Sequence, residues 1–176
     1  MKLFFFDEAS FYRQPTQASL WYERGRTQPR VRWSYRSNKV LRVAAALEAV
    51  EGGIIYKMAS RISIPVLCRY YEQLAKSYPD CPRLCVVQDN WPIHAHPKVL
   101  QAVKQLERIE LVFLPTYAPY LNPEEKVWRW TKQHLVHAHP YSDDFNEFKR
   151  QVCTALDEAD QKKPEILRYC GLQVNN

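Results

Sequence analysis

The sequence predicts an α/β protein in which helices flank a mixed β-sheet. Three strand-like apolar runs come first, at 2–12, 40–50 and 54–58, and two glycines separate the second run from the third. Strands and helices then alternate, beginning with a helical repeat of apolar residues over 63–78. Antiparallel strands followed by such alternation are typical of a mixed sheet covered by helices. The length of 176 residues and the hydrophobic content of 46% suit one domain with a substantial core.

The first three strands are expected to pair as hairpins. The run 2–12 is interrupted by polar residues only at Asp7, Glu8 and Ser10. The segment 44–48 favours a helix by its intrinsic propensity, but a glycine pair and a plain strand follow it. That combination indicates a hairpin, so we expect strands on both sides of the glycines.

Much of the positive charge lies in the segment 13–42. Eight basic residues occur there with one acid, Glu23, and the whole chain has a formal net charge of +6. Prolines and a glycine predict an irregular connection, with a short strand near 31–35. Basic residues interleaved with aromatic ones suit a phosphate backbone and exposed bases, although a solvated loop whose aromatics pack on the core is the alternative. The residues expected to contact DNA are Arg24, Arg26, Arg30, Arg32, Arg36 and Lys39.

The second half of the chain continues the alternation. The expected elements are helix 63–78, strand 83–88, a helix opening at His96, strand 109–114, loop 115–123, helix 123–137 and a last helix ending near 161. Prolines punctuate these elements and fit the first turns of several helices. Residues 1–162 are therefore expected to form one domain, and residues 163–176 a C-terminal tail.

Several classes of protein are excluded by composition. No apolar run approaches the roughly 20 residues that a membrane-spanning helix needs. The five cysteines are odd in number and lack the spacing of a disulfide framework, which favours reduced thiols in the cytoplasm. Cys81 and Cys85 precede His94 and His96, but their spacing matches no common zinc module.

Two aspartates each end an apolar strand. Asp7 follows Leu-Phe-Phe-Phe, and Asp89 follows the run 84–88. If these strands are neighbours, both carboxylates emerge at one edge of the sheet, whereas Glu8 should point to the opposite face. Two carboxylates about 4 Å apart repel by roughly 4 kcal/mol at an effective dielectric of 20, and a divalent cation reverses that sign. Oxygen ligands suit Mg²⁺ or Mn²⁺, and a pair of such ions can cleave a phosphodiester.

A third acidic site opens the helix at 123–137. Asn122 fits the N-cap position, Pro123 fits N1, and Glu125 then falls at the capping-box position. The helix dipole also favours a carboxylate in the first turn. Spacing alone therefore separates neither a cap from a metal ligand nor Glu125 from Glu124.

Three blocks of sequence resemble the catalytic blocks of DDE-superfamily transposases, in particular the bacterial insertion-sequence and mariner-like enzymes. The blocks are FFFDEASFY at 4–12, VVQDNWPIH at 86–94 and LPTYAPYLNPEEKVW at 114–128. In the family, an asparagine follows the catalytic aspartate of the second block and a histidine stands five positions beyond it. Asn90 and His94 fit this pattern. The third block assigns the acid to Glu125, with 35 residues between it and Asp89. The resemblance covers roughly residues 3–150.

The resemblance implies an RNase H-like fold for the domain at 1–162. It implies that Asp7, Asp89 and Glu125 are the catalytic residues and the ligands of Mg²⁺ or Mn²⁺, with Asn90 and His94 supporting the ligands or contacting substrate. The reaction expected is cleavage and joining of DNA, with water and then a DNA 3′-hydroxyl attacking phosphate. A catalytically silent DNA-binding or regulatory fragment of a transposase is the alternative.

The resemblance also implies partners and a location. Transposon ends and target DNA are the expected partners, with a homodimer assembled on DNA, in the bacterial cytoplasm at the nucleoid. Family members usually carry a helix-turn-helix domain before the catalytic domain, whereas this chain begins at the first catalytic strand. A separate helix-turn-helix domain or polypeptide is therefore expected to recognise the transposon ends.

Overall fold

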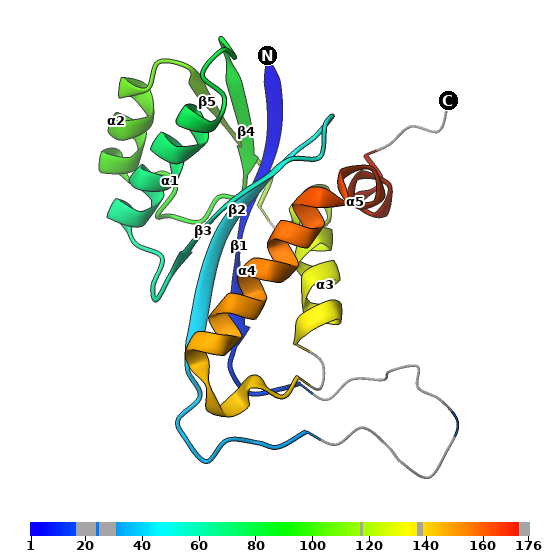
Figure 1. Ribbon diagram of the computed structural model, residues 1–176. Coiled ribbons are helices and arrows are strands. Elements are labelled where there is room, and N and C mark those ends of the chain that lie inside the picture. Colours follow the sequence, from blue (N-terminus) through cyan, green and yellow to red (C-terminus); the bar gives the residue numbers. More distant parts are fainter. Residues whose placement is uncertain (17–23, 25–30, 117, 137–138, 173–176) are drawn as a thin grey trace.

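A five-stranded mixed sheet forms the centre of the computed structural model, which describes residues 1–16, 24, 31–116, 118–136 and 139–172 (Figure 1). The strands are β1 (Lys2–Tyr12), β2 (Val40–Glu48), β3 (Ile54–Ala59), β4 (Leu84–Gln88) and β5 (Ile109–Phe113). Their order in the sheet is β3-β2-β1-β4-β5. The first three strands are antiparallel, while β4 runs parallel to both β1 and β5. The predicted mixed sheet is confirmed.

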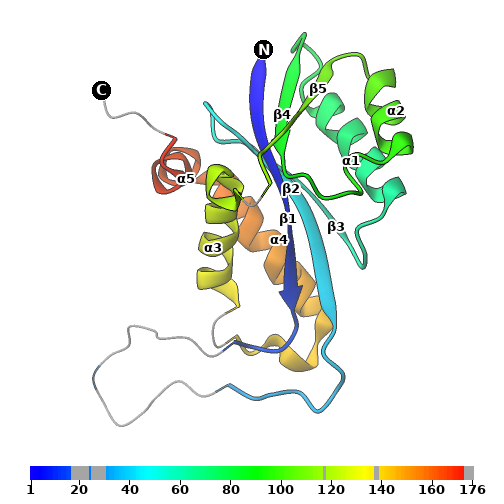
Figure 2. The same cartoon turned by 180° about the vertical axis from the view of Figure 1, so that it is seen from behind.

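Helices cover both faces of this sheet (Figures 1 and 2). The helices are α1 (Ile64–Ser77), α2 (Pro97–Gln105), α3 (Glu124–Leu135), α4 (Phe145–Gln161) and α5 (Lys163–Cys170), with short 3-10 turns at Pro119–Leu121 and Tyr141–Asp143. One hydrophobic core lies between the sheet and α1 and α2, and a second lies between the sheet and α3, α4 and α5. None of the helices described is long and apolar enough to cross a membrane.

Strand β2 shows why the alanine-rich segment is not a helix. Ala44 and Ala46 are buried in the core of α1 and α2, whereas Ala45 and Leu47 are buried in the core of α3, α4 and α5. A strand places alternate residues on opposite faces, so β2 fills both cores at once, which outweighs the helix propensity of alanine. The turn after β2 needs a glycine at Gly52, where φ is +77° and a Cβ would lie 2.9 Å from a backbone oxygen of α5.

Two segments differ from the sequence-based expectation. The short strand near 31–35 is absent from the described residues; there the backbone of Ser34 binds the side chain of Gln14, with hydrogen bonds of 2.8 and 3.0 Å. The expected tail contains α5, whose Ile166 is fully buried. Pro164 lies in the first turn of α5, where a proline initiates a helix as readily as it interrupts one.

Candidate active site

Asp7 and Asp89 lie at the same level of two neighbouring strands. The parallel register of β1 and β4 pairs Phe5 with Val87, and each aspartate follows two residues later. Adjacent strands are about 4.8 Å apart, so this register brings the two carboxylates together at the end of β4. The prediction that the two acids share an edge of the sheet is confirmed by this pairing.

Asn122 fixes the start of α3 against β1. Its Nδ2 donates to the backbone oxygen of Phe6 at 2.9 Å, and its Oδ1 accepts from the backbone nitrogen of Glu124 at 3.2 Å. The expected capping box requires Glu125 to be the third helical residue. Because α3 begins at Glu124, Glu125 is instead the second helical residue. This attachment places the first turn of α3 beside Asp7.

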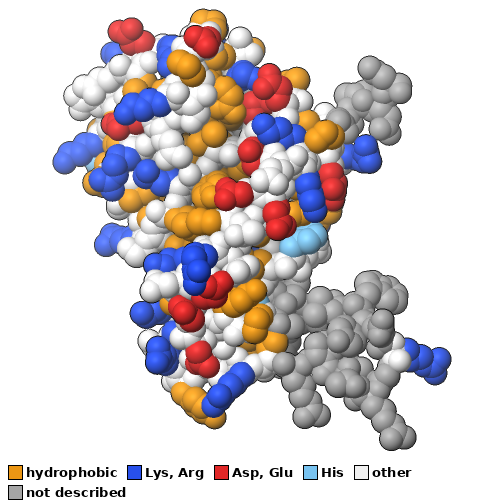
Figure 3. All heavy atoms as spheres, in the orientation of Figure 1, with side chains coloured by type: hydrophobic (Ala, Val, Ile, Leu, Met, Phe, Trp, Pro, Cys, Tyr) orange, Lys and Arg blue, Asp and Glu red, His pale blue; other side chains and the backbone are white. Residues whose placement is uncertain are grey.

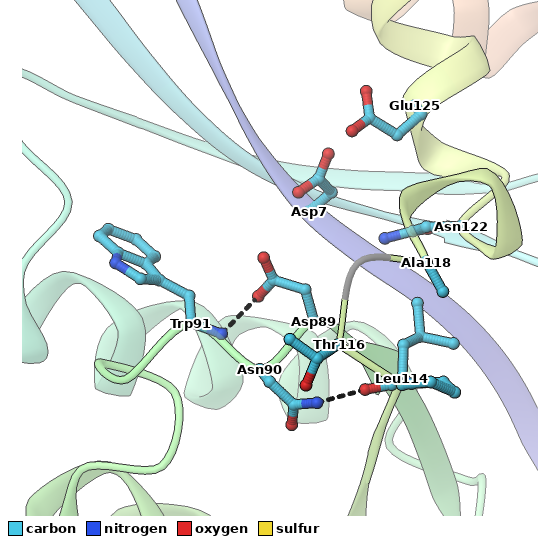
Figure 4. A pocket seen from close by; sticks show the side chains of 10 residues that line it. Asp7, Asp89, Asn90, Trp91, Leu114, Thr116, Ala118, Asn122 and Glu125 are labelled. Atoms are coloured by element: carbon cyan, nitrogen blue, oxygen red, sulfur yellow. Dashed lines mark hydrogen bonds between the residues drawn. The ribbon is translucent and has the colours of Figure 1, made fainter.

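The three predicted acids line one cavity of about 260 Å³ (Figure 4). Asp7 comes from β1, Asp89 from the end of β4 and Glu125 from α3, and their carboxylates point toward a common space. Asn90 and Trp91 also line this cavity. The sheet and α3 therefore bring Asp89 and Glu125 to Asp7, although both are more than 80 positions from it in sequence.

Glu124 and Glu125 have opposite environments. Glu125 is exposed and lines the cavity, whereas Glu124 is completely buried beneath it. Neither carboxylate oxygen of Glu124 has a hydrogen-bond partner of normal geometry among the described residues. Burial raises the pKa of Glu124 well above its usual value, and the nearby Asp7 raises it further. Burial thus favours the neutral form of Glu124, whereas the side chain of Glu125 faces the cavity.

The environment of Asp7 disfavours its ionised form. Burial raises its pKa from 3.8 to about 7, and the negative charge of Glu125 acts in the same direction. Two hydrogen bonds oppose this shift: the backbone N–H of Glu8 donates to the carboxylate, and the indole Nε1 of Trp128 donates to Oδ2 of Asp7 at 3.0 Å. A positive ion in the cavity would therefore stabilise the ionised form of Asp7.

Asp89 and Asn90 are held by the loops around them. One carboxylate oxygen of Asp89 accepts a hydrogen bond of 3.0 Å from the backbone nitrogen of Trp91, and the side-chain nitrogen of Asn90 donates to the backbone oxygen of Leu114 (Figure 4). The bond from Asn90 joins the end of β4 to the residue that follows β5. Asn90 therefore shapes the cavity wall beside Asp89.

His94 connects Asp89 to Glu8. The imidazole is buried, with Nδ1 2.9 Å from Oδ1 of Asp89 and Nε2 2.9 Å from Oε1 of Glu8. Burial, the largest single effect, lowers the pKa of His94, but the contacts with Glu8 and Asp89 together outweigh it, and the net pKa is raised. Both ring nitrogens face carboxylate oxygens, an arrangement that suits the imidazolium. Glu8 lies on the opposite face from Asp7, as expected, and sequence spacing gave no sign of its contact with His94.

None of the expected DNA-contacting residues that the structure describes lines the cavity of the three acids. Arg32 lies over the ring of Tyr35, and Lys39 over the ring of Phe145. Arg36 and Lys39 line another cleft, at the start of α4. Arg24 is exposed, while Arg26 and Arg30 fall outside the described residues. Acidic and basic side chains are interspersed over α4 on the face seen in Figure 3, a mixture typical of a solvated surface.

The carboxylate oxygens that line the cavity are the kind of ligand that a hard divalent cation prefers. Among the described residues, no three Asp, Glu, His or Cys side chains are grouped closely enough to form a complete metal site. The cavity nevertheless offers carboxylate oxygens from three different elements, the ligands that Mg²⁺ and Mn²⁺ prefer. Burial and the neighbouring Glu125 raise the pKa of Asp7, and a cation bound here would oppose that rise.

Solved structures share this fold. The catalytic domain of Mos1 mariner transposase superposes with a TM-score of 0.55 at 15% identity, covering 99% of this chain and 84% of that chain. A pre-cleavage Mos1 transpososome gives a TM-score of 0.64 at 15% identity over 96% of this chain and 54% of that one. The catalytic core of BIV integrase superposes with a TM-score of 0.53 at 17% identity, covering 88% of this chain and 80% of that chain. The architecture is therefore that of RNase H-like transposase and integrase cores.

Sequence comparison identifies the family. A protein of Shigella sonnei, described as an insertion element IS630 uncharacterized 39 kDa protein, is 22% identical over 148 residues, which cover 84% of this chain and 43% of that protein. This chain thus spans less than half the length of that relative. The model of the DDE superfamily endonucleases matches residues 2–149. The chain therefore belongs to the DDE superfamily endonucleases.

Proposed function

We propose that this chain is the catalytic domain of a transposase that cuts and joins DNA phosphodiesters at Asp7, Asp89 and Glu125. The register that sets Asp7 beside Asp89, with Glu125 facing them across one cavity, carries this proposal. The names of similar structures support it, since Mos1 paired-end complexes are described with Mn, with Mg and with a transposon end. Mg²⁺ or Mn²⁺ would be held by the three carboxylates.

Each supporting residue has a distinct task in this proposal. The carboxylates of Asp7, Asp89 and Glu125 would hold divalent ions, which would supply activation of a water and stabilisation of the leaving oxygen of the phosphodiester. Trp128 orients the carboxylate of Asp7, and His94 orients that of Asp89. Asn122 holds the first turn of α3 on β1, which keeps Glu125 opposite the two aspartates. The protein thus preorganises the ligands before DNA arrives.

The remaining parts of the proposal concern assembly. Transposon ends and target DNA would be the substrates, and a homodimer would form on DNA. Arg24, Arg26, Arg30, Arg32, Arg36 and Lys39 would bind phosphates outside the catalytic cavity. A separate helix-turn-helix domain or polypeptide would recognise the ends, in the bacterial cytoplasm at the nucleoid. Residues 1–162 would form the catalytic unit, with α5 packed on it.

Metal binding and nicking test the proposal together. Isothermal titration calorimetry with Mg²⁺ and Mn²⁺ should show binding to the wild type and much weaker binding to Asp89→Asn. Asp80→Asn is the matched control, because Asp80 is exposed and lines a cleft that contains none of the three acids. Equal, tight binding by wild type and Asp89→Asn would refute the site. DNA binding without metal-dependent nicking of plasmid DNA would instead indicate a silent regulatory fragment.

A further inference from the structure

A second cleft continues from the catalytic cavity along β1. It has a volume of about 490 Å³ and shares Asp7, Asp89 and Trp91 with the cavity of the three acids. Beyond these shared residues, its walls include Arg42 on β2 and Arg61, which follows β3. We propose that Arg42 and Arg61 form a subsite for the DNA strand adjoining the scissile phosphate, an inference that rests on the proposed function.

The sheet register sets the distance between this subsite and the catalytic acids. Arg42 pairs directly with Ser10, which is three residues beyond Asp7 on β1. Three residues of strand span about 10 Å at roughly 3.3 Å each. Ser10 lies on the face of β1 that carries Glu8, so the cleft joins this face to that of Asp7. A DNA strand that follows the cleft, at about 3.4 Å per nucleotide, would place a phosphate at Arg42 a few nucleotides from the bond that is cut.

The charge of these two arginines is not neutralised within the described part of the chain. Neither Arg42 nor Arg61 forms an ion pair there, in contrast to Arg83, which pairs with Glu110. Glu8 lies in the same cleft but is bound to His94. The subsite therefore holds two cations that form no ion pair with the carboxylates of the same cleft, among the described residues.

Ser10 orients one of these cations without cancelling its charge. Nη1 of Arg42 donates to the hydroxyl oxygen of Ser10, which is neutral. The guanidinium keeps further donors for a ligand, and its planar array of N–H groups matches the oxygens of a phosphate. A phosphodiester is favoured over a carboxylate side chain because the cleft opens directly onto the proposed cutting site.

Salt dependence of DNA binding tests this subsite. Fluorescence anisotropy with a labelled duplex in Ca²⁺ measures binding without requiring cleavage. Arg42→Ala and Arg61→Ala should each weaken binding several-fold and reduce the slope of log K against log salt by about one, because one phosphate contact is lost. Arg42→Lys should keep the slope. Arg83→Ala is the matched control, because it removes an exposed arginine outside the cleft and should leave the slope unchanged.

The outcomes separate this inference from the proposed function. If the wild type fails to nick DNA but binding depends on both arginines, the subsite stands and the catalytic proposal falls. If both alanine variants bind with the affinity and salt slope of the wild type, the subsite is refuted even where nicking persists. An equal loss of slope in Arg83→Ala would also refute it, since the effect would then reflect overall charge. Circular dichroism confirms that each variant is folded.

Discussion

Nε2 of the buried His94 lies 2.9 Å from Oε1 of Glu8, on the opposite face of β1 from Asp7. The residues are 86 positions apart in sequence, and the contact closes only when β4 pairs with β1. Because the other nitrogen of the same ring contacts Asp89, Glu8 acts on the cavity through His94. Glu8 is thus a positioning residue for Asp89.

Glu8→Gln tests this positioning role. Glutamine can still accept a hydrogen bond but lacks the charge that stabilises the imidazolium, so the pKa of His94 should fall. Loss of such supporting contacts typically costs 10- to 100-fold in metal affinity or activity, and nicking should fall by about that factor. Nuclear magnetic resonance titration of the His94 ring measures the pKa directly. Glu110→Gln, on the exposed β5 side chain that pairs with Arg83, is the control. An unchanged His94 pKa together with full nicking would rule out the role.

Asp7 makes the stability of the metal-free protein depend on pH. Its pKa is raised from 3.8 to about 7, mainly by burial, so the folded state binds more protons than the unfolded chain between these values. The free energy of unfolding from this group therefore falls as pH rises through that window, by at most about 4 kcal/mol. In Asp7→Asn, the free energy of unfolding should fall less as pH rises. This variant should also be more stable than the wild type at pH 8 without metal.

Urea denaturation at pH 5 and pH 8 measures this effect. Mg²⁺ should restore stability to the wild type at pH 8 and have little effect on Asp7→Asn, because a bound cation removes the penalty on the ionised carboxylate. Asp80→Asn, on an exposed residue, should follow the wild type. A pH dependence equally steep in Asp7→Asn would show that Asp7 is not the group responsible.

The sequence predicted the convergence of Asp7 and Asp89 at one edge of the sheet, but not the contacts around them. Asp7 and Asp89 were identifiable because each interrupts an apolar strand, and β1 and β4 proved to be parallel neighbours. The pairing of Glu8 with His94, and the convergence of Arg42 and Arg61 on one cleft, depend on strand order and register, which local patterns do not encode. Basic residues in particular carry no local signal that separates a cleft from a solvated surface.

Helix α5 was missed for a related reason. Pro164 follows a long helix, and a proline there is as consistent with an end of structure as with a new start. Ile166→Ala should cost about 2–5 kcal/mol in unfolding free energy, because the side chain is fully buried against α3 and α4. Urea denaturation measures the loss. Glu165→Ala, at the exposed neighbouring position, should change stability by less than about 0.5 kcal/mol. A negligible effect of Ile166→Ala would mean that α5 is not part of the folded unit.

The two adjacent glutamates of α3 should behave in opposite ways. Glu125→Gln removes a charge that faces Asp7, so it should abolish metal-dependent nicking and also lower the pKa of Asp7. Burial raises the pKa of Glu124 and favours its neutral form, and glutamine is a neutral residue of nearly the same shape, so Glu124→Gln should keep the fold and most of the activity. Nicking assays on both variants, with circular dichroism as the folding control, decide between them. A dead Glu124→Gln beside an active Glu125→Gln would move the third ligand by one position. Activity in both variants would show that α3 supplies no essential carboxylate, and the three-acid mechanism would have to be abandoned.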